Sequence, residues 1–280
     1  MNFPQFWARG QSGNFFTWRW SATNLAEAQT LANQAAQQIA ARFSAGEFPP
    51  KGGGYYPNRP FREQLLQEIK NPAGEIAAVV TRNSYGCQVL NTAKVMFVDI
   101  DLPEPKSPGL FARLFGGKKE TTPPPSSKQA AALTKIENWT RQHSDWGWRI
   151  YQTRAGLRLL ATQTLVDADS KVALDIFEAL GADPLYRHLC AAQKCFRARL
   201  TPKPWRCGIR QKPDRWPFLD AKAATRFQRW DAQYLSYSGS WATCHLIRQI
   251  GNPTVHPEIQ PIIKLHDTAT RVGEAGLQLA

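Results

Sequence analysis

Residues 95–102 read Val95-Met96-Phe97-Val98-Asp99-Ile100-Asp101-Leu102, an apolar segment interrupted by two aspartates. The β-branched and aromatic residues predict a strand. Side chains alternate between the two faces of a strand, so Asp99 and Asp101 project together from one face. Adjacent carboxylates repel each other unless they reach water or share a cation. The pattern therefore fits either a strand that ends in solvent or a site for Mg²⁺ or Mn²⁺, which prefer carboxylate oxygens.

The composition of the chain suits a folded protein with a polyanionic partner. Of the 280 residues, 42% are hydrophobic and 11% aromatic, and the formal net charge is +13. Nucleic acid is the commonest partner for such an excess of positive charge, and an anionic membrane surface is the second. The sequence contains neither an apolar run of about 18 residues, which a membrane span requires, nor a recognisable signal peptide. We expect a cytoplasmic protein whose five cysteines are reduced, and the lack of a Cys-x₂-Cys pair argues against zinc.

The segments before the acidic strand predict further strands and a long helix. Asn24 and Glu27 form a capping box that opens a helix ending near Ser44. Trp18 and Trp20 share a face, and we expect them to pack on this helix rather than to stack on bases. The sequence also predicts strands at Phe15–Trp20, Glu75–Thr81 and Gly86–Leu90 and a short helix at Arg62–Lys70. The last two of these strands would lead into the acidic strand as an antiparallel meander.

Two segments lack the composition of a core. Residues 49–60, rich in Gly, Pro and Tyr, predict a loop. Residues 103–127 contain six prolines and cannot bury enough apolar surface to order themselves. Because helices and strands resume after this segment, we interpret 103–127 as a mobile insertion within a single domain that spans residues 1–280.

Beyond the insertion, helices and strands alternate without a repeat. The predicted helices are Lys128–His143, Asp169–Leu180, Leu185–Lys194, Ala221–Tyr237 and Pro257–Thr270. The predicted strands are Trp148–Thr153, Leu157–Thr164, Phe196–Leu200, Trp205–Arg210 and Thr243–Ile247. This alternation indicates an α/β or α+β class.

Two short motifs in this half of the chain could contact a phosphate or a metal ion. The hairpin turn from Thr153 to Arg158 combines a hydroxyl, glycine and two arginines, which together suit a phosphate. An ordinary hairpin with solvated arginines would account for it equally well. Asp183, directly before Pro184, reads either as the N-cap of a helix or as a third acidic ligand.

The strongest charge feature is a basic run from Leu185 to Arg215. It contains nine Lys or Arg residues and a single acid, Asp214. Arg197 and Arg199 alternate along one predicted strand, and Lys203 follows just beyond. A solvated surface explains such a concentration of charge less well than contact with a polyanion does.

The order of these motifs resembles the archaeo-eukaryotic primase superfamily, which includes primase-polymerases. In this resemblance, Val98–Asp101 matches the first acidic motif, whose carboxylates hold divalent metals. Residues Thr153–Arg158 match the second motif, a turn that contacts nucleotide phosphates. Asp183 matches the third acidic motif, and Phe196–Lys203 resembles the basic strand that follows it. The similarity covers residues 75–210, about half of the chain.

The resemblance implies a fold, a reaction and a set of site residues. The fold would be α/β (α+β), with an RRM-like antiparallel sheet that carries the acids and an αβ unit from the N-terminal third. The reaction would be metal-dependent nucleotidyl transfer on DNA or RNA with nucleoside triphosphates. Asp99, Asp101 and Asp183 would be the catalytic residues and would bind two Mg²⁺ or Mn²⁺ ions. The residues implied to bind nucleotide or phosphate are Thr153, Arg154, Gly156, Arg158, Arg197, Arg199 and Lys203.

One position departs from the family pattern. The second motif of the family normally ends in a histidine, and this chain has Arg158 there. Arginine can bind a phosphate but cannot act as a titrating or neutral donor. Two other functions therefore stay open. One is a non-catalytic nucleic-acid- or nucleotide-binding relative, and the other is a metal-dependent nuclease that uses the same acids.

Overall fold

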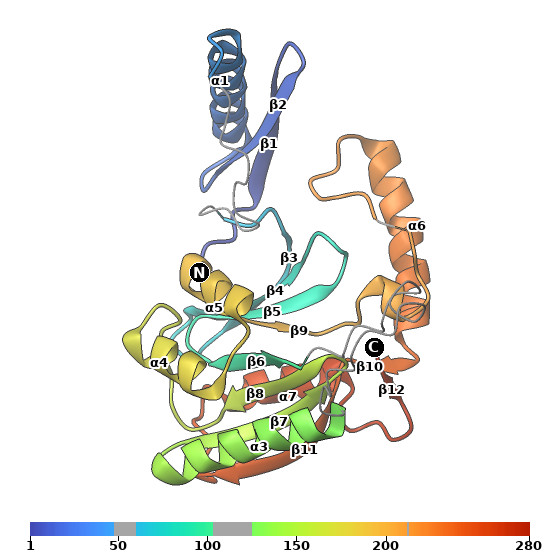
Figure 1. Cartoon of the computed structure of the whole chain (residues 1–280). Helices are drawn as coiled ribbons and strands as arrows, with labels where there is room; N and C mark the ends of the chain where they lie inside the picture. Colours follow the sequence, from blue (N-terminus) through green and yellow to red (C-terminus); the bar gives the residue numbers. More distant parts are fainter. Residues whose placement is uncertain (48–59, 103–124, 212) are drawn as a thin grey trace, which may run out of the picture.

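A computed structural model describes residues 1–47, 60–102, 125–211 and 213–280 (Figure 1). The predicted loop lies outside the described residues except for Pro60. The predicted mobile insertion also lies outside them, except that residues 125–127 form the first turn of a helix. The described chain contains helices and antiparallel sheets, which confirms the α+β class.

The first of two four-stranded sheets has the order β3-β4-β5-β9. Its strands are β3 (Gln64–Lys70), β4 (Ile76–Arg82), β5 (Gln88–Thr92) and β9 (Phe196–Arg199). The helix predicted at Arg62–Lys70 is wrong, because this segment pairs antiparallel with β4 as an edge strand. Its Leu, Gln, Glu and Lys residues favour a helix locally, but the free edge of β4 gives their backbone groups partners that local propensity cannot anticipate.

The second sheet carries the acidic strand and has the order β11-β7-β8-β6. Its strands are β6 (Phe97–Asp101), β7 (Gly147–Thr153), β8 (Gly156–Ala161) and β11 (Cys244–Gly251). The antiparallel pairing of β4 with β5 in the predicted meander is confirmed, but its continuation into the acidic strand is wrong, because β5 pairs with β9 and β6 pairs with β8. In the observed register Asp99 lies directly opposite Arg158, and this cross-strand pairing of opposite charges favours β8 as the neighbour.

Two helices cover opposite faces of the second sheet. They are α3 (Pro125–Gln142) and α7 (Gln260–Thr270). On β7, Trp148 contacts Trp139 of α3, whereas Tyr151 contacts His266 of α7. Tyr151 is paired in register with Arg158, so the charged residues of β6 and β8 lie on the α7 face. The largest hydrophobic core surrounds this sheet.

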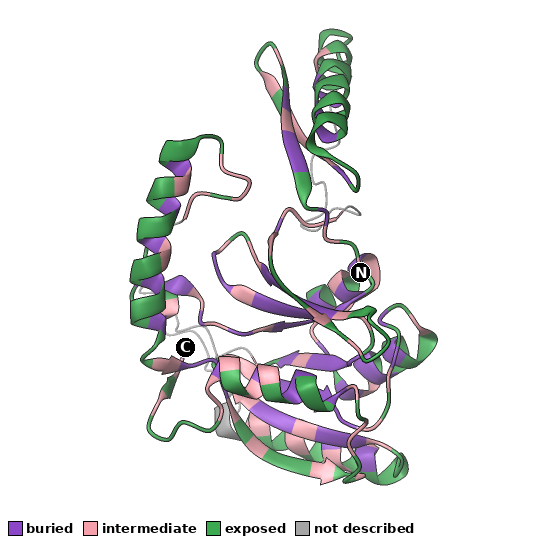
Figure 2. Ribbon diagram, turned by 180° about the vertical axis from the view of Figure 1, so that it is seen from behind, coloured by how far each residue is buried: buried purple, intermediate pink, exposed green. Residues whose placement is uncertain are grey.

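The remaining elements surround the sheets (Figure 1). They are α4 (Lys171–Leu180), α5 (Pro184–Gln193), the 3₁₀ helix η1 (Pro204–Arg206), α6 (Ala221–Ser238), β10 (Trp241–Ala242) and β12 (Gln278–Leu279). The strand predicted at Trp205–Arg210 is wrong, because Pro204 begins the 3₁₀ turn there. Figure 2 shows burial concentrated on the sheets, whereas α6 is exposed over much of its surface. No described helix has an apolar stretch long enough to cross a membrane.

The N-terminal unit projects from the sheets in Figure 1. The strand register places its tryptophans on the face away from its helix. Gly10 faces that helix, since a Cβ placed on Gly10 would lie 2.0 Å from the carbonyl oxygen of Ala32. Thr17 pairs with Gly10, so the alternate residues Trp18 and Trp20 lie on the opposite face. The predicted packing of these tryptophans on the helix is wrong. Small residues such as Gly10 face the helix instead, and they allow the strands to lie closer to the helix than tryptophans would. The elements of the unit are β1 (Phe6–Ser12), β2 (Phe15–Ser21) and α1 (Leu25–Ser44).

Gly156 allows the acidic strand and β8 to approach each other. A Cβ at this position would lie 2.0 Å from the carbonyl oxygen of Ile100. We expect Gly156→Ala to lower the free energy of unfolding by about 1–3 kcal/mol, measured by urea denaturation. Gly273→Ala is the control, because a Cβ there meets no atom within 4 Å and should change stability little. Equal stability of the two variants would contradict the close approach of β6 and β8.

Candidate functional site

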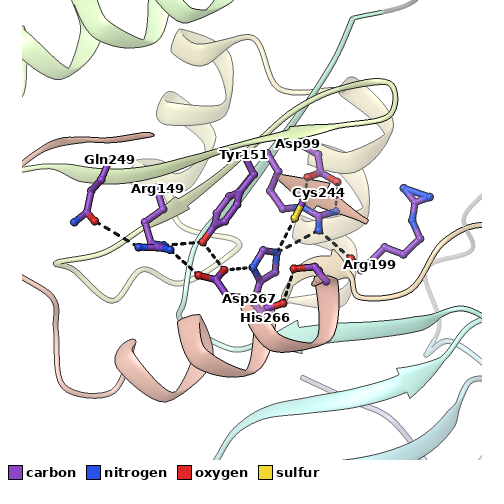
Figure 3. Close-up of polar contacts among 10 residues, drawn as sticks. Asp99, Arg149, Tyr151, Arg199, Cys244, Gln249, His266 and Asp267 are labelled. Atoms are coloured by element: carbon purple, nitrogen blue, oxygen red, sulfur yellow. Dashed lines mark hydrogen bonds and ion pairs between the residues drawn. The ribbon is translucent and has the colours of Figure 1, made fainter. Parts of the chain in front are cut away.

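An ion pair between Asp99 and Arg158 lies at the centre of the acidic strand (Figure 3). The Arg158 Nε donates to Asp99 Oδ1 at 2.8 Å, and Nη2 donates to Oδ2 at 3.3 Å. The third nitrogen, Nη1, donates to the backbone carbonyl of Arg199 at 3.0 Å. Only 1% of the Arg158 side chain is exposed, against 26% of the Asp99 side chain. The guanidinium is therefore fixed by its partners and binds both carboxylate oxygens in a bidentate pair.

His266 of α7 is the next residue in the network, and it lies between Arg158 and Asp267. Its Nδ1 lies 2.9 Å from Asp267 Oδ1, and its Nε2 lies 3.5 Å from Arg158 Nη1. We assign the proton to Nδ1, because a carboxylate can only accept, which leaves Nε2 to accept from Arg158. Burial lowers the pKa of His266, and the nearby Arg158 acts in the same direction even though Asp267 opposes it. His266 therefore serves as a neutral support for Arg158.

Asp267 is held in turn by two residues of β7. The Tyr151 hydroxyl donates to Oδ1 at 2.8 Å, and Arg149 Nη2 donates to Oδ2 at 2.6 Å. Burial opposes ionisation of Asp267, but hydrogen bonds from His266 and Tyr151 lower its pKa. Burial, followed by the charge of Asp267, raises the pKa of Tyr151, so this phenol keeps its proton. A continuous polar network thus runs from Asp99 to Arg149 across the α7 face, as Figure 3 shows.

The structure brings Asp101 and Asp183 close to Asp99. The backbone N–H of Asp183 donates to the backbone carbonyl of Asp99 at 2.9 Å, and its Oδ1 accepts from the N–H of Tyr186 at 2.8 Å. Asp183 is therefore the N-cap of α5 as well as a neighbour of the acidic strand. Burial raises the pKa of Asp101, and the charges of Asp183 and Asp99 raise it further. The three predicted acids do lie in one region.

The arrangement of these acids does not fit a two-metal centre. Among the described residues, no group of three or more His, Cys, Asp or Glu side chains is arranged to hold a metal ion. Asp99 directs both carboxylate oxygens to Arg158, and Asp183 uses one oxygen to cap a helix. A guanidinium thus supplies the positive charge that divalent ions would otherwise bring to the strand. The resemblance implies Mg²⁺ or Mn²⁺ at these acids, and a metal titration in solution tests that expectation against this arrangement.

Arg199, Lys203 and Arg206 interact with Asp101, and Arg154 interacts with Arg206. We call these four residues the basic cluster: Arg154, Arg199, Lys203 and Arg206. Burial, then Arg199 and Arg206, lowers the pKa of Lys203. Burial, then Arg199 and Arg154, lowers the pKa of Arg206. Asp101 opposes both shifts but does not cancel them. The basic cluster therefore has an excess of positive charge that an anion would relieve.

Arg199 points part of its side chain away from the internal network. Its backbone carbonyl accepts from Arg158, while Figure 3 shows its guanidinium directed away from His266. Within the described part of the chain, the buried Nη1 of Arg199 has no hydrogen-bond partner. A buried N–H group without an acceptor costs free energy, so this nitrogen is suited to an incoming oxygen atom.

Three other residues that were predicted to bind phosphate make contacts within the protein instead. Arg197 Nη2 donates to both oxygens of Glu63, at 2.8 and 3.0 Å, and this pair is buried. Gly156 faces the carbonyl of Ile100 and is required for packing between strands. Thr153 is paired in register with Gly156 at the end of the β7–β8 hairpin. We therefore leave Arg197, Gly156 and Thr153 out of the basic cluster.

Sequence reasoning missed residues that belong to this region. Arg206 was counted in the basic run but not selected, although it follows Lys203 and a tryptophan. The His266-Asp267 dipeptide stands in a correctly predicted helix, and an adjacent histidine and aspartate were a usable signal. The pairing of Glu63 with Arg197 spans 134 residues and gives no local signal.

No protein-family model, curated protein or solved structure matches this chain. The resemblance to the primase superfamily therefore depends on the four motifs quoted above.

The two aspartates of β6 should respond oppositely to the loss of charge. Asp99→Asn leaves the buried Arg158 without its counter-ion, and we expect a loss of about 3–5 kcal/mol in the free energy of unfolding. Asp101→Asn should instead raise the melting temperature at pH 7. The raised pKa means that the folded state binds a proton more tightly, so the ionised Asp101 costs stability above that pKa.

The advantage of Asp101→Asn should shrink as the pH falls through the raised pKa of Asp101, because the wild-type carboxyl then becomes neutral as well. Thermal melts of both variants over a range of pH would measure the difference. The control is Asp167→Asn, which removes an exposed carboxylate from the loop before α4. A stabilising Asp99→Asn substitution at neutral pH would refute the ion pair as the dominant contact of Asp99.

Proposed function

We propose that this protein binds nucleic acid through its phosphate groups at the basic cluster, without a divalent ion on the acidic strand. The observation that carries the proposal is the proximity of Arg199, Lys203 and Arg206: burial, and after it the charges of neighbouring cations, lowers the pKa of Lys203 and of Arg206. Phosphates placed among these groups would relieve the repulsion between them. Counterion release would add to affinity, since each neutralised phosphate frees ions into solution.

Two further observations support this proposal. The formal net charge of +13 provides long-range attraction for a polyanion of any sequence. The buried Nη1 of Arg199, which no described residue satisfies, offers a donor to a phosphate oxygen. Contacts of this kind position a nucleic acid without reading its bases, so little sequence preference is expected.

The topology of the second sheet supports a primase-like fold as part of the same proposal. Its strands follow the order β6-β8-β7, and helix α3 connects β6 to β7. This is the strand–helix–strand–strand arrangement that an RRM-like sheet would have. Arg158 occupies the position where the family has histidine, and it is engaged by Asp99. Nucleic-acid binding is compatible with that substitution, whereas the chemistry that depends on the histidine is not.

Metal-dependent nucleotidyl transfer is the second candidate. The observation that favours it is the convergence of Asp101 and Asp183 on Asp99, which the resemblance implied. Because Arg158 engages both oxygens of Asp99, we derive no catalytic step from these acids.

Removal of two cations from the basic cluster tests the proposed function. We expect Lys203→Ala/Arg206→Ala to weaken the binding of single-stranded DNA and RNA, measured by fluorescence anisotropy of labelled oligonucleotides. The slope of log K against log salt concentration should fall by about 1.4, since each contact on a single strand contributes about 0.7. The charge-matched control is Lys135→Ala/Lys171→Ala, which removes exposed lysines from α3 and α4.

Equal affinity and salt slope in both double variants would move the binding surface away from the basic cluster. The same oligonucleotides, incubated with Mn²⁺ and nucleoside triphosphates, separate the candidate activities. Lengthened products would favour nucleotidyl transfer, and shortened products would favour the metal-dependent nuclease. The proposed function predicts binding with no change in oligonucleotide length.

A further inference from the structure

Trp205 places a large exposed aromatic ring next to the basic cluster. It stands between Lys203 and Arg206 in the 3₁₀ turn η1, and half of its surface (50%) is exposed. Aromatic rings with one open side are enriched at binding surfaces, where they supply a large contact area at low entropic cost. The position of this ring among cations distinguishes it from the exposed aliphatic residues elsewhere on the chain.

The conformation of the turn is fixed by local hydrogen bonds. The N–H groups of Cys207 and Ile209 both donate to the carbonyl of Pro204, at 3.2 and 2.9 Å. The rings of Tyr85 and Trp205 pack in a T-shaped arrangement, with centroids 5.2 Å apart and an angle of 79° between the planes. The ring is therefore oriented before any ligand arrives, and binding would cost little ordering of the protein.

Lys203 connects this ring to the phosphate-binding groups. Its Nζ lies over the Trp205 ring, 5.4 Å from the centroid, and burial, followed by the charges of Arg199 and Arg206, lowers its pKa. A nucleotide joins its base to its phosphate through a single sugar, so adjacent sites for a base and a phosphate match its chemistry. A duplex would bring phosphates to the cations but would keep its base faces stacked inside.

We propose that Trp205 is a stacking platform for an unpaired base, which makes single-stranded nucleic acid the ligand of the basic cluster. This inference rests on the proposed function, because it specifies the form of the nucleic acid that the cluster binds. Stacking on one aromatic face is tolerant of sequence, since each of the bases has a π face. DNA and RNA single strands share this chemistry.

The test compares two ligands of equal length and charge, an oligothymidylate and an abasic oligomer with the same phosphates. Trp205→Leu keeps an apolar side chain but removes the π face. We expect it to weaken oligothymidylate binding by roughly tenfold, with an unchanged salt slope and unchanged affinity for the abasic oligomer. Trp205→Phe should retain much of the affinity. Phe16→Ala is the control for loss of an exposed aromatic ring, because Phe16 is 59% exposed on β2.

Each outcome separates this inference from the proposed function. If Trp205→Leu binds both ligands as the wild type does, the stacking platform is refuted, but the proposed binding of phosphates by the basic cluster is unaffected. If it loses affinity for both ligands equally, Trp205 shapes the cluster and does not stack on a base. If Lys203→Ala/Arg206→Ala retains wild-type affinity for both ligands, the proposed function fails. Urea denaturation of each variant confirms that the protein remains folded.

Discussion

The bidentate ion pair between Arg158 and Asp99 connects the parts of this molecule that meet at the acidic strand. A single buried guanidinium contacts β6 through Asp99, the first sheet through the carbonyl of Arg199, and α7 through His266. Burial of an arginine is tolerated only where its charge is paired and its donors are satisfied. The contacts with Asp99, the Arg199 carbonyl and His266 meet this requirement, and they connect β6, β9 and α7 through one side chain.

Ion pairs inside the protein neutralise some of the charged residues near the acidic strand and leave others with a net charge. Asp99 and Arg158 neutralise each other, so the acidic strand keeps its uncompensated charge at Asp101, beside the basic cluster. Arg197 is likewise neutralised by Glu63. Arg199, Lys203 and Arg206 influence one another and retain their excess positive charge. In the function we propose, the Asp99–Arg158 pair is part of the scaffold, and the neighbouring cations form the surface that binds an anion.

Local sequence patterns predicted many of the helices and strands. The pairing of segments that lie far apart in the sequence could not be predicted from such patterns. Asn24 and Asp183 cap α1 and α5, and such caps can be recognised from a few adjacent residues. The shared face of Asp99 and Asp101 follows from strand periodicity alone. The contact of Asp99 with Arg158 depends on a register between segments 59 residues apart, which no local pattern specifies. For the same reason, the strand at Gln64–Lys70 could not be anticipated from its helix-forming residues, because its structure depends on pairing with β4.

The central claim is that Arg158 takes the place of a divalent cation at the acidic strand. Calorimetric titration of Mn²⁺ into the wild-type protein tests this claim most directly. Nucleoside triphosphate is present at constant concentration, and the heat of Mn²⁺ binding to the triphosphate alone is subtracted. The account predicts no binding to the protein at millimolar Mn²⁺ and no rise in melting temperature. Stoichiometric binding of Mn²⁺ that is lost in both Asp99→Asn and Asp183→Asn would contradict it.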